Sequence, residues 1–154
     1  MTLSYSMVYS IIYFLLWTLM LYWIHRLVHA TPLLKNIHWD HHRYVLVSTP
    51  GWRWNNLLLF NDTWTSTIDL WITEVIPTIV FSYITGQWWL CALYYVWAAF
   101  FQENLEHNKD VDFRFWTMGR WHLVHHNNST KHFGLFIPVW DMMFKTVVKK
   151  AEIL

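Results

Sequence analysis

Charged side chains are scarce in this sequence. Asp, Glu, Lys and Arg make up 14% of its 154 residues, whereas roughly 25% is usual for soluble domains. Apolar residues account for 55% and aromatic residues for 20%, including 13 tryptophans. Such a chain has too few charges to cover a water-exposed surface, so we expect an integral membrane protein. The net charge of +1 gives no basis for a nucleic-acid partner.

Cysteine is almost absent as well. Cys91 is the only cysteine, which excludes an intrachain disulfide and a zinc site built from cysteines. Because Cys91 lies in an apolar run, we expect it to be a small packing residue. The length of the chain is that of one domain, and we expect residues 1–154 to form a single membrane domain.

The first 24 residues carry no charged side chain. A bilayer core about 30 Å thick requires roughly 20 apolar residues in a helix, so residues 3–24 are long enough to cross it. A signal peptide would begin with basic residues and end at a small-residue cleavage site. Neither feature is present, and we therefore expect an uncleaved membrane helix, followed by a first histidine-bearing segment at residues 25–62.

A second charge-free block covers 28 residues, Val75 to Gln102. It could form one tilted span, but the sequence YITGQW places Gly86 among polar neighbours, which is typical of a turn. The alternative is a hairpin of two membrane helices at residues 63–84 and 87–106. In a hairpin, Asp69 and Glu74 would face the protein interior, because a carboxylate exposed to lipid is costly.

The basic residues decide between these alternatives. All eleven Lys and Arg fall in residues 26–53 and 109–150, and none lies near the N-terminus or Gly86. The positive-inside rule places both basic segments on the cytoplasmic side, which requires an even number of crossings between them. We therefore predict an all-α protein with about three transmembrane helices. Its N-terminus would lie opposite to the cytoplasmic amphipathic helices that carry the histidines.

Histidine, in contrast, is abundant and clustered. All ten histidines fall in residues 25–42 and 107–132. The first window contains HRLVH and HWDHH, and the second window, which we assign to a tail segment at residues 107–154, contains WHLVHH. Scattered surface histidines would not repeat one His-x-x-His-His triplet in both windows.

The spacing of these histidines indicates a metal centre. Residues three and four apart share one face of a helix, so each triplet places three imidazoles within an arc of about 100°. Two such helices facing each other could surround two metal ions, whereas a lone structural zinc needs only about four ligands. Imidazole suits iron, copper, nickel and zinc. The predicted ligands are His25, His29, His38, His41, His42, His107, His122, His125 and His126.

Together with HFG and VWDMMFKT near the end of the chain, these motifs resemble those of the fatty acid hydroxylase/sterol desaturase superfamily. The resemblance covers roughly residues 20 to 147 with the motifs in the expected order. It implies an integral membrane enzyme in which two histidine-bound iron ions and O2 hydroxylate or desaturate a lipid C–H bond. Carotenoid hydroxylases have a related histidine pattern, but their characteristic residues after the first paired histidines are not evident.

The sequence departs from the family pattern at several positions. His132 stands where the family usually has Asn, and Lys145 stands where Gly is usual. His107 lies in the segment FQENLEH, whose sequence differs from that of the corresponding segment in many family members. A ligating histidine normally donates the N–H of its other ring nitrogen to an acceptor. The carboxylate candidates for that role are Asp40, Asp69, Glu103, Glu106, Asp110 and Asp141. His132, Glu103, Asp69 and Asp141 are the candidates for that role or for an additional ligand.

The leading expectation is therefore a membrane di-iron, O2-dependent hydroxylase acting on a fatty acyl, sterol or isoprenoid lipid. The alternatives are a lipid desaturase of the same family and a metal-binding membrane protein without oxygen chemistry. No flavin or haem motif is present, so electrons would come from a separate ferredoxin, rubredoxin or cytochrome. Zinc could replace iron during purification, because zinc binds more tightly in the usual affinity order. Three spans form a thin wall, which favours a homo-oligomer.

Overall fold

The computed structural model describes residues 2–47, 51–61, 63–113 and 115–148, with the side chains of all of these except residues 2–4, 44–47 and 103. Within these ranges the chain is helical and forms no β-strand, which confirms the all-α part of the predicted fold class. One isolated bridge pairs Asp112 with Gly119. Its helices are α1 (Thr2–Ala30), α2 (Pro32–Val47), η1 (Trp54–Leu58), α3 (Trp64–Leu70), η2 (Trp71–Val75), α4 (Ile76–Thr85), α5 (Trp89–Trp97), η3 (Ala98–Glu106), α6 (Arg120–Asn127) and α7 (Val139–Met143).

Helix α1 contains neither glycine nor proline and runs unbroken for 29 residues. It therefore continues past residue 24, where we expected the first membrane helix to end. His25 and His29 lie on the last turns of α1 rather than on a separate cytoplasmic helix. Pro32 then occupies the first position of α2, where its missing N–H costs no helical hydrogen bond. The chain changes direction sharply between α1 and α2 at this point.

The expected hairpin is present. Helices α3, η2 and α4 form one continuous helical rod, and Gly86 ends it in the left-handed conformation with φ of +71°. Helix α5 and its continuation η3 then run back along it. Both η2 and η3 are π-helical, and the π-turn of η2 ends just before Pro77, which has no N–H for a regular helical bond.

Two helices are long and apolar enough to cross a membrane, Tyr5–Ala30 and Trp64–Thr85. The apolar part of the third, Trp89–Gln102, is shorter than the roughly 20 residues that a perpendicular crossing requires. The count of three crossings and the placement of the histidines in the cytoplasm stay predictions. The first half of α1 exposes large apolar side chains such as Tyr9 (60%) and Ile11 (57%), a surface that suits lipid and not water.

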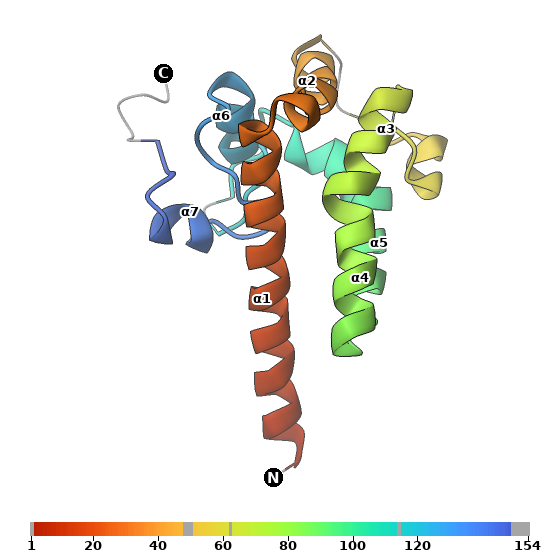
Figure 1. Cartoon of the computed structure of the whole chain (residues 1–154), viewed down its shortest axis with the longest axis vertical. Coiled ribbons are helices and arrows are strands. Elements are labelled where there is room, and N and C mark those ends of the chain that lie inside the picture. The colour runs from red at the N-terminus through yellow and green to blue at the C-terminus, as the bar shows by residue number, and fades with distance from the viewer. Residues whose placement is uncertain (1, 48–50, 62, 114, 149–154) are drawn as a thin grey trace.

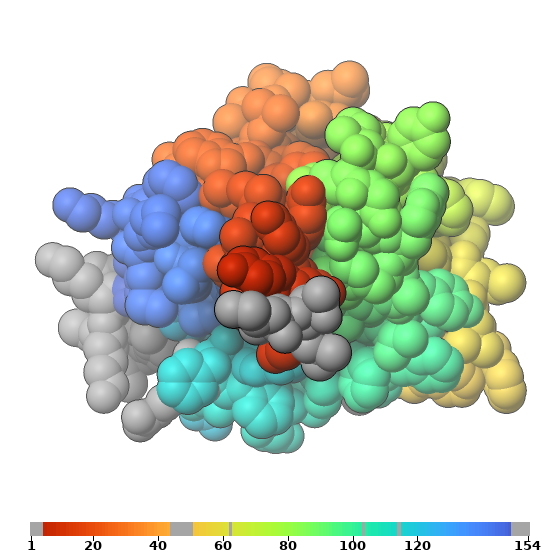
Figure 2. All heavy atoms as spheres, turned by 90° about the horizontal axis from the view of Figure 1, so that it is seen from below, coloured from red at the N-terminus to blue at the C-terminus, as the bar shows by residue number. Residues whose placement is uncertain are grey.

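Trp17 on α1 lies at the centre of the apolar core. Its indole N–H donates to the hydroxyl of Thr78 on α4 at 3.0 Å, and its ring packs against Phe136 with the centroids 4.7 Å apart. Viewed from the N-terminal end, α1 occupies the middle of the molecule, with α4 on one side and the α7 region on the other (Figure 2). Helix α1 thus joins the hairpin to the C-terminal segment.

The histidine-bearing elements gather at one end of the molecule. The C-terminal end of α1, helix α2 and helix α6 lie together, far from the N-terminus (Figure 1). Helix α6 is tied to the end of η3, because the N–H of Gly119 donates to the carbonyl of Glu106 at 2.9 Å. The two histidine windows, separated by more than sixty residues in sequence, therefore meet.

Candidate metal centre

The first group of converging histidines draws on three helices. His25 and His29 come from α1, His38 and His42 from α2, and His125 from α6; one ligand atom of each lies within 4.8 Å of all the others. Three pairs of Nε2 atoms are closer still. They join His25 to His38 at 3.3 Å, His42 to His38 at 3.1 Å and His29 to His125 at 2.9 Å.

The second group lies beside the first. It consists of His41 from α2, His107 at the end of η3, and His122 and His126 from α6, again within 4.8 Å of one another. The Nε2 atoms of His122 and His126 are 2.9 Å apart. The groups touch through His42 and His126, whose ring centroids are 4.3 Å apart. All nine histidines predicted as ligands are thus placed in two adjacent groups.

Each His-x-x-His-His triplet is divided between the two groups. His38 and His42 belong to the first group and His41 to the second; on α6, His125 belongs to the first group and His122 and His126 to the second. Positions three and four apart share a face, but consecutive positions differ by about 100° around the helix axis. The paired histidines at the end of each triplet therefore point toward different neighbours.

The nitrogen spacing fits a bound metal ion in each group. Metal–imidazole bonds of about 2.0–2.1 Å place neighbouring ligand nitrogens roughly 2.9–3.4 Å apart in octahedral or tetrahedral geometry. The four Nε2 pairs named above are separated by 2.9 to 3.3 Å. Among the described residues, both ring nitrogens of His107 are buried without a hydrogen-bond partner. A buried polar group in that state indicates an unfilled bonding requirement.

The environment keeps the imidazoles neutral. Burial lowers the pKa of His42 to about 4, and burial together with the nearby His42 lowers the pKa of His107 to about 3. Burial and the surrounding imidazoles also hold the pKa of His38, His41, His122, His125 and His126 well below the usual value of 6.5. A neutral imidazole has a free lone pair, which is the form that binds a metal ion.

Hydrogen bonds behind the rings fix the orientation of three histidines. His38 Nδ1 lies 2.8 Å from Asp69 Oδ2, His25 Nδ1 lies 2.9 Å from the Phe133 carbonyl oxygen, and His125 Nδ1 lies 2.6 Å from the Lys131 carbonyl oxygen. A carbonyl oxygen only accepts, so His25 and His125 must donate from Nδ1. Their Nε2 lone pairs then face the first group, an arrangement typical of metal-bound histidine. In the second group, Glu106 Oε1 lies 3.5 Å from His122 Nδ1.

Asp141 was predicted to be a ligand or a hydrogen-bond partner of a ligand. In the structure it supports the first histidine group through a loop. Its buried carboxylate accepts hydrogen bonds from the N–H groups of Phe133 and Gly134 at 2.8 and 2.9 Å and from the Thr146 hydroxyl at 2.7 Å. A side chain at Gly134 would meet the carboxylate, since a Cβ atom there would lie 2.8 Å from Asp141 Oδ2. Asp141 thus holds the loop whose Phe133 carbonyl orients His25.

His132 lies outside both groups. Its Nδ1 is 3.1 Å from the Trp121 carbonyl oxygen, and its Nε2 accepts from the N–H of Val148 at 2.9 Å. Both nitrogens therefore bond to the backbone and leave none for a metal ion. His132 has a φ of +55°, a conformation that suits Asn and is found for His more often than for most residues. This left-handed backbone conformation explains why the family motif usually has Asn at the position of His132.

The remaining sequence candidates have different outcomes. Asp69 contacts His38 directly, whereas the side chain of Glu103 lies outside the described residues. Sequence reasoning missed the Phe133 and Lys131 carbonyl groups, and residue identity offers no signal for them because every residue has a carbonyl. It also left Glu74 without an assigned role. Glu74 accepts a hydrogen bond from the Tyr94 hydroxyl at 3.2 Å.

A small cavity of about 20 Å³ borders both histidine groups. Such a volume is enough for one molecule the size of water. Its walls combine imidazoles with acidic and amide side chains and include His25, His38, His41, Asp69, Glu74, Gln102, Glu106 and His122. The site can therefore hold two metal ions side by side next to a small, polar and enclosed space.

Comparison with known proteins assigns the family. The family model described as fatty acid hydroxylase matches residues 10–146, a range that contains all ten histidines and Asp141. No curated protein and no solved structure matches the chain. The matched range covers most of the sequence and ends at Thr146, whose hydroxyl closes the hydrogen-bond network of Asp141. The chain therefore belongs to the fatty acid hydroxylase family.

Proposed function

We propose that this protein is a membrane di-iron oxygenase that uses O2 to hydroxylate a C–H bond of a lipid. The observation that carries the proposal is the presence of two adjacent histidine groups with metal-ligand spacing in a chain of the fatty acid hydroxylase family. When bound, two ferrous ions would supply the electrons that activate O2, the oxidant that an unactivated C–H bond requires. The metals carry this difficult chemistry, and the protein supplies position and electrostatics.

The residues of the first group would be held ready for iron by the contacts behind them. His25 and His125 donate from Nδ1 to backbone carbonyls, which fixes the tautomer with a free Nε2 lone pair. The Asp69 carboxylate accepts from His38 and offsets part of the positive charge that neutral ligands leave on a metal ion. Glu106, next to His122, would do the same for the second group.

The burial of the site would protect the reaction from water. His125 and Glu106 have 0% and 2% of their surface exposed, respectively. A site of this kind limits water entry and side reactions of a strong oxidant. The small cavity that borders both groups would leave room for no more than one water-sized molecule beside the histidines.

The setting in the cell completes the proposal. The lipid would enter from the bilayer, and a separate ferredoxin, rubredoxin or cytochrome would deliver electrons. The basic segments flank the histidine groups, which supports a cytoplasmic site with the N-terminus on the opposite side. Contact between copies of the chain in a homo-oligomer would cover part of the exposed apolar surface of the helices.

The first test is metal content per chain after anaerobic loading with ferrous iron. We expect about two iron ions in the unchanged protein, because each histidine group supplies enough neutral nitrogen ligands for one ion. His125→Ala removes a ligand of the first group and His41→Ala a ligand of the second. Each variant should retain about one ion, bound by the intact group, and should lose O2-dependent turnover.

The control is Tyr9→Phe, an exposed position on α1 far from the histidines in sequence, which should keep both ions and full activity. A single ion in the unchanged protein, or unchanged content in both histidine variants, would disprove the dinuclear centre. Analysis of products from candidate lipids, together with O2 consumption, separates an alcohol from a new double bond. A product with a new double bond would show that the protein is a desaturase and not a hydroxylase.

A further inference from the structure

The loop between α6 and α7 supplies two carbonyl groups that orient ligands of the first histidine group. The Lys131 carbonyl accepts from His125 Nδ1 at 2.6 Å. The Phe133 carbonyl accepts from His25 Nδ1 at 2.9 Å. Between them lies His132, which is buried and has a φ of +55°, in the left-handed region. His132 is therefore the joint between the two residues whose carbonyl groups orient His25 and His125.

Hydrogen bonds hold the peptide group that precedes His132 at both of its ends. In a trans peptide group the C=O and the N–H point in opposite directions. At one end the Lys131 carbonyl faces His125. At the other end the His132 N–H donates to the Thr146 carbonyl at 3.0 Å. A rotation of this peptide group would therefore break both contacts.

The imidazole of His132 connects the joint to two other segments. Its Nδ1 donates to the Trp121 carbonyl at 3.1 Å, in the first turn of α6, and its Nε2 accepts from the Val148 N–H at 2.9 Å. The Trp121 ring packs on the imidazole with the centroids 4.2 Å apart. A left-handed conformation of a residue other than glycine persists only where surrounding contacts hold it. These hydrogen bonds are contacts of that kind.

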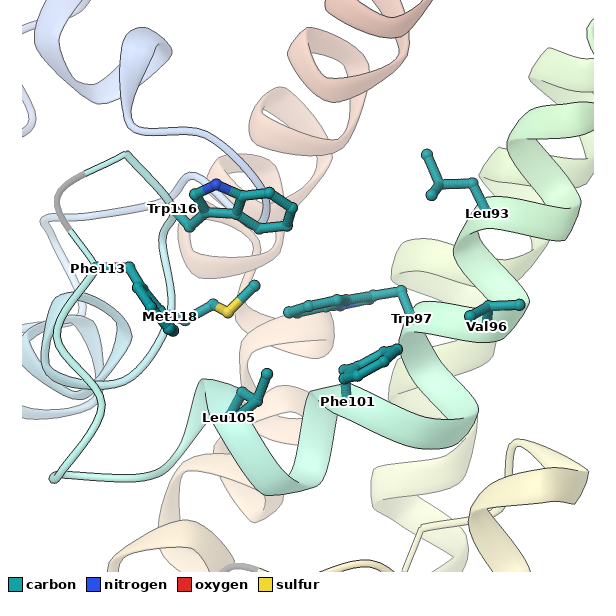
Figure 3. A pocket seen from close by; sticks show the side chains of 8 residues that line it. All are labelled: Leu93, Val96, Trp97, Phe101, Leu105, Phe113, Trp116 and Met118. Carbon is teal, nitrogen blue, oxygen red and sulfur yellow. The ribbon is translucent and has the colours of Figure 1, made fainter.

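The start of α6 is a fixed point for this connection. Just before it, the buried Met118 borders an apolar cavity of about 410 Å³, and its side chain points toward Trp97 of α5 (Figure 3). The neighbouring Thr117 N–H donates to the Phe136 carbonyl at 3.2 Å. The Trp121 N–H donates to the Met118 carbonyl at 3.3 Å. The Trp121 carbonyl is thus anchored in the core on the helix that carries His125.

We propose that His132 is a positioning residue of the candidate metal centre. Its Nδ1–H bond to α6 holds the loop so that the carbonyl groups of Lys131 and Phe133 keep His125 and His25 in the tautomer with a free Nε2. The proposal rests on the proposed di-iron function and adds to it a residue that is no ligand. The bond from Nε2 fastens Val148 to the same loop and is not required for the orientation of the ligands.

Two substitutions separate the two contacts of His132. Asn, the usual residue at this position of the family motif, can place an amide N–H where Nδ1–H lies, and it adopts the left-handed conformation. Its side chain has no acceptor at the place of Nε2. Gln is one bond longer and can place its acceptor oxygen near Nε2, but it leaves the Trp121 carbonyl without a donor. His132→Ala removes both contacts.

The tautomers of His25 and His125 test the proposal without metal. Solid-state NMR of metal-free protein with ¹⁵N-labelled histidine, in lipid at neutral pH, distinguishes a protonated from an unprotonated ring nitrogen. The spectra of His25→Ala and His125→Ala assign the signals. In the unchanged protein we expect both residues to carry the proton on Nδ1 alone. In His132→Ala each should show signals of both tautomers, because the carbonyl groups no longer hold the rings.

Rescue distinguishes positioning from a general structural role. His132→Asn should restore the single Nδ1–H tautomer of both ligands, whereas His132→Gln should not. Hydrogen exchange at the Val148 amide should show the reverse, with fast exchange in His132→Asn and slow exchange in His132→Gln. Thr130→Ala is the matched control, an exposed residue of the same loop whose hydroxyl bonds to Asn128, and it should change neither readout. Rescue of the tautomer by Gln and not by Asn would overturn the proposal.

Ferrous iron binding locates the effect. In the His41→Ala background only the first group is complete, and there His132→Ala should weaken iron binding about tenfold, a loss typical of residues that orient metal ligands. In the His125→Ala background only the second group is complete, and there His132→Ala should leave the affinity unchanged. Equal weakening in both backgrounds would indicate a general loss of structure and would overturn the proposal.

The two readouts keep this proposal separate from the proposed function. If the unchanged protein binds no ferrous iron, the di-iron proposal fails, while mixed tautomers in His132→Ala still support the positioning role. Two bound ions in the unchanged protein, with tautomers and affinity unaltered in His132→Ala, would overturn the positioning role and leave the di-iron proposal intact.

Discussion

Asp141 connects the family's C-terminal motif to the histidines. Its carboxylate satisfies three donors, two of which are backbone N–H groups of the loop that orients His25 through the Phe133 carbonyl. Because all of these groups are buried, the loss of one acceptor leaves a donor without a partner. The residue thus acts on the first histidine group through the backbone of the loop that orients His25.

Asp141→Asn should therefore destabilise the protein. An amide offers one acceptor oxygen instead of two, so at least one buried N–H loses its partner, at a cost of about 1–3 kcal/mol. The midpoint of thermal unfolding in detergent should fall, and iron should bind more weakly because His25 is less well oriented. Asp110→Asn, at an exposed position, should change neither quantity. An unchanged midpoint for Asp141→Asn would contradict the network described above.

At the scale of elements, the two π-helical segments shape the interior next to the histidines. In η2, the residues Thr73 and Glu74 are buried, and in η3 Gln102 and Glu106 are buried. Gln102 and Tyr94 both donate to the carboxylate of Glu74. These contacts tie the two helices of the hairpin together by polar groups inside an otherwise apolar packing. π-Turns occur frequently at functional sites.

Removing the Tyr94 hydroxyl tests this connection. Tyr94→Phe leaves the buried carboxylate of Glu74 with only the longer contacts from Gln102, at 3.5 Å. The free energy of unfolding should fall by about 1–3 kcal/mol, as measured by thermal or denaturant unfolding. Tyr95→Phe is the neighbouring control, because its hydroxyl donates to the Leu57 carbonyl at an exposed site. We expect Tyr94→Phe to cost clearly more; equal costs would argue against a buried polar tie.

At the scale of the whole molecule, nine histidines packed within two groups make the metal-free fold sensitive to acid. The pKa of His42 is lowered to about 4 and that of His107 to about 3. The unfolded chain, with pKa values near 6.5, therefore binds more protons than the folded protein between these limits. Stability is fully present above about pH 6.5 and decreases as the pH falls toward 4 and 3.

Thermal unfolding of the metal-free protein between pH 8 and pH 4, with a chelator present, measures this dependence. The unfolding midpoint should be constant above about pH 7 and should decrease below about pH 6.5. His107→Gln removes one of the titrating groups and should flatten the decrease. A midpoint that rises on acidification would contradict the neutral, buried state of these imidazoles.

Local sequence determined the helical class, the apolar helices and the choice of histidine for the candidate metal site. Charge-free runs of 24 and 28 residues and a glycine between polar neighbours at position 86 are enough to predict the helices and their turn, because length, hydropathy and turn chemistry are local properties. The repeated histidine triplets likewise predict a metal centre, since residues three and four apart share a helix face.

Tertiary structure alone decided how these residues are used. The division of His41 and His42 between two groups depends on which helices lie opposite each face of α2, and no local pattern contains that information. The same holds for the carbonyl partners of His25 and His125, for the exclusion of His132 by its two backbone contacts, and for the apolar cavity beside η3. Each of these arises from contacts between segments distant in sequence, which form only when the helices pack.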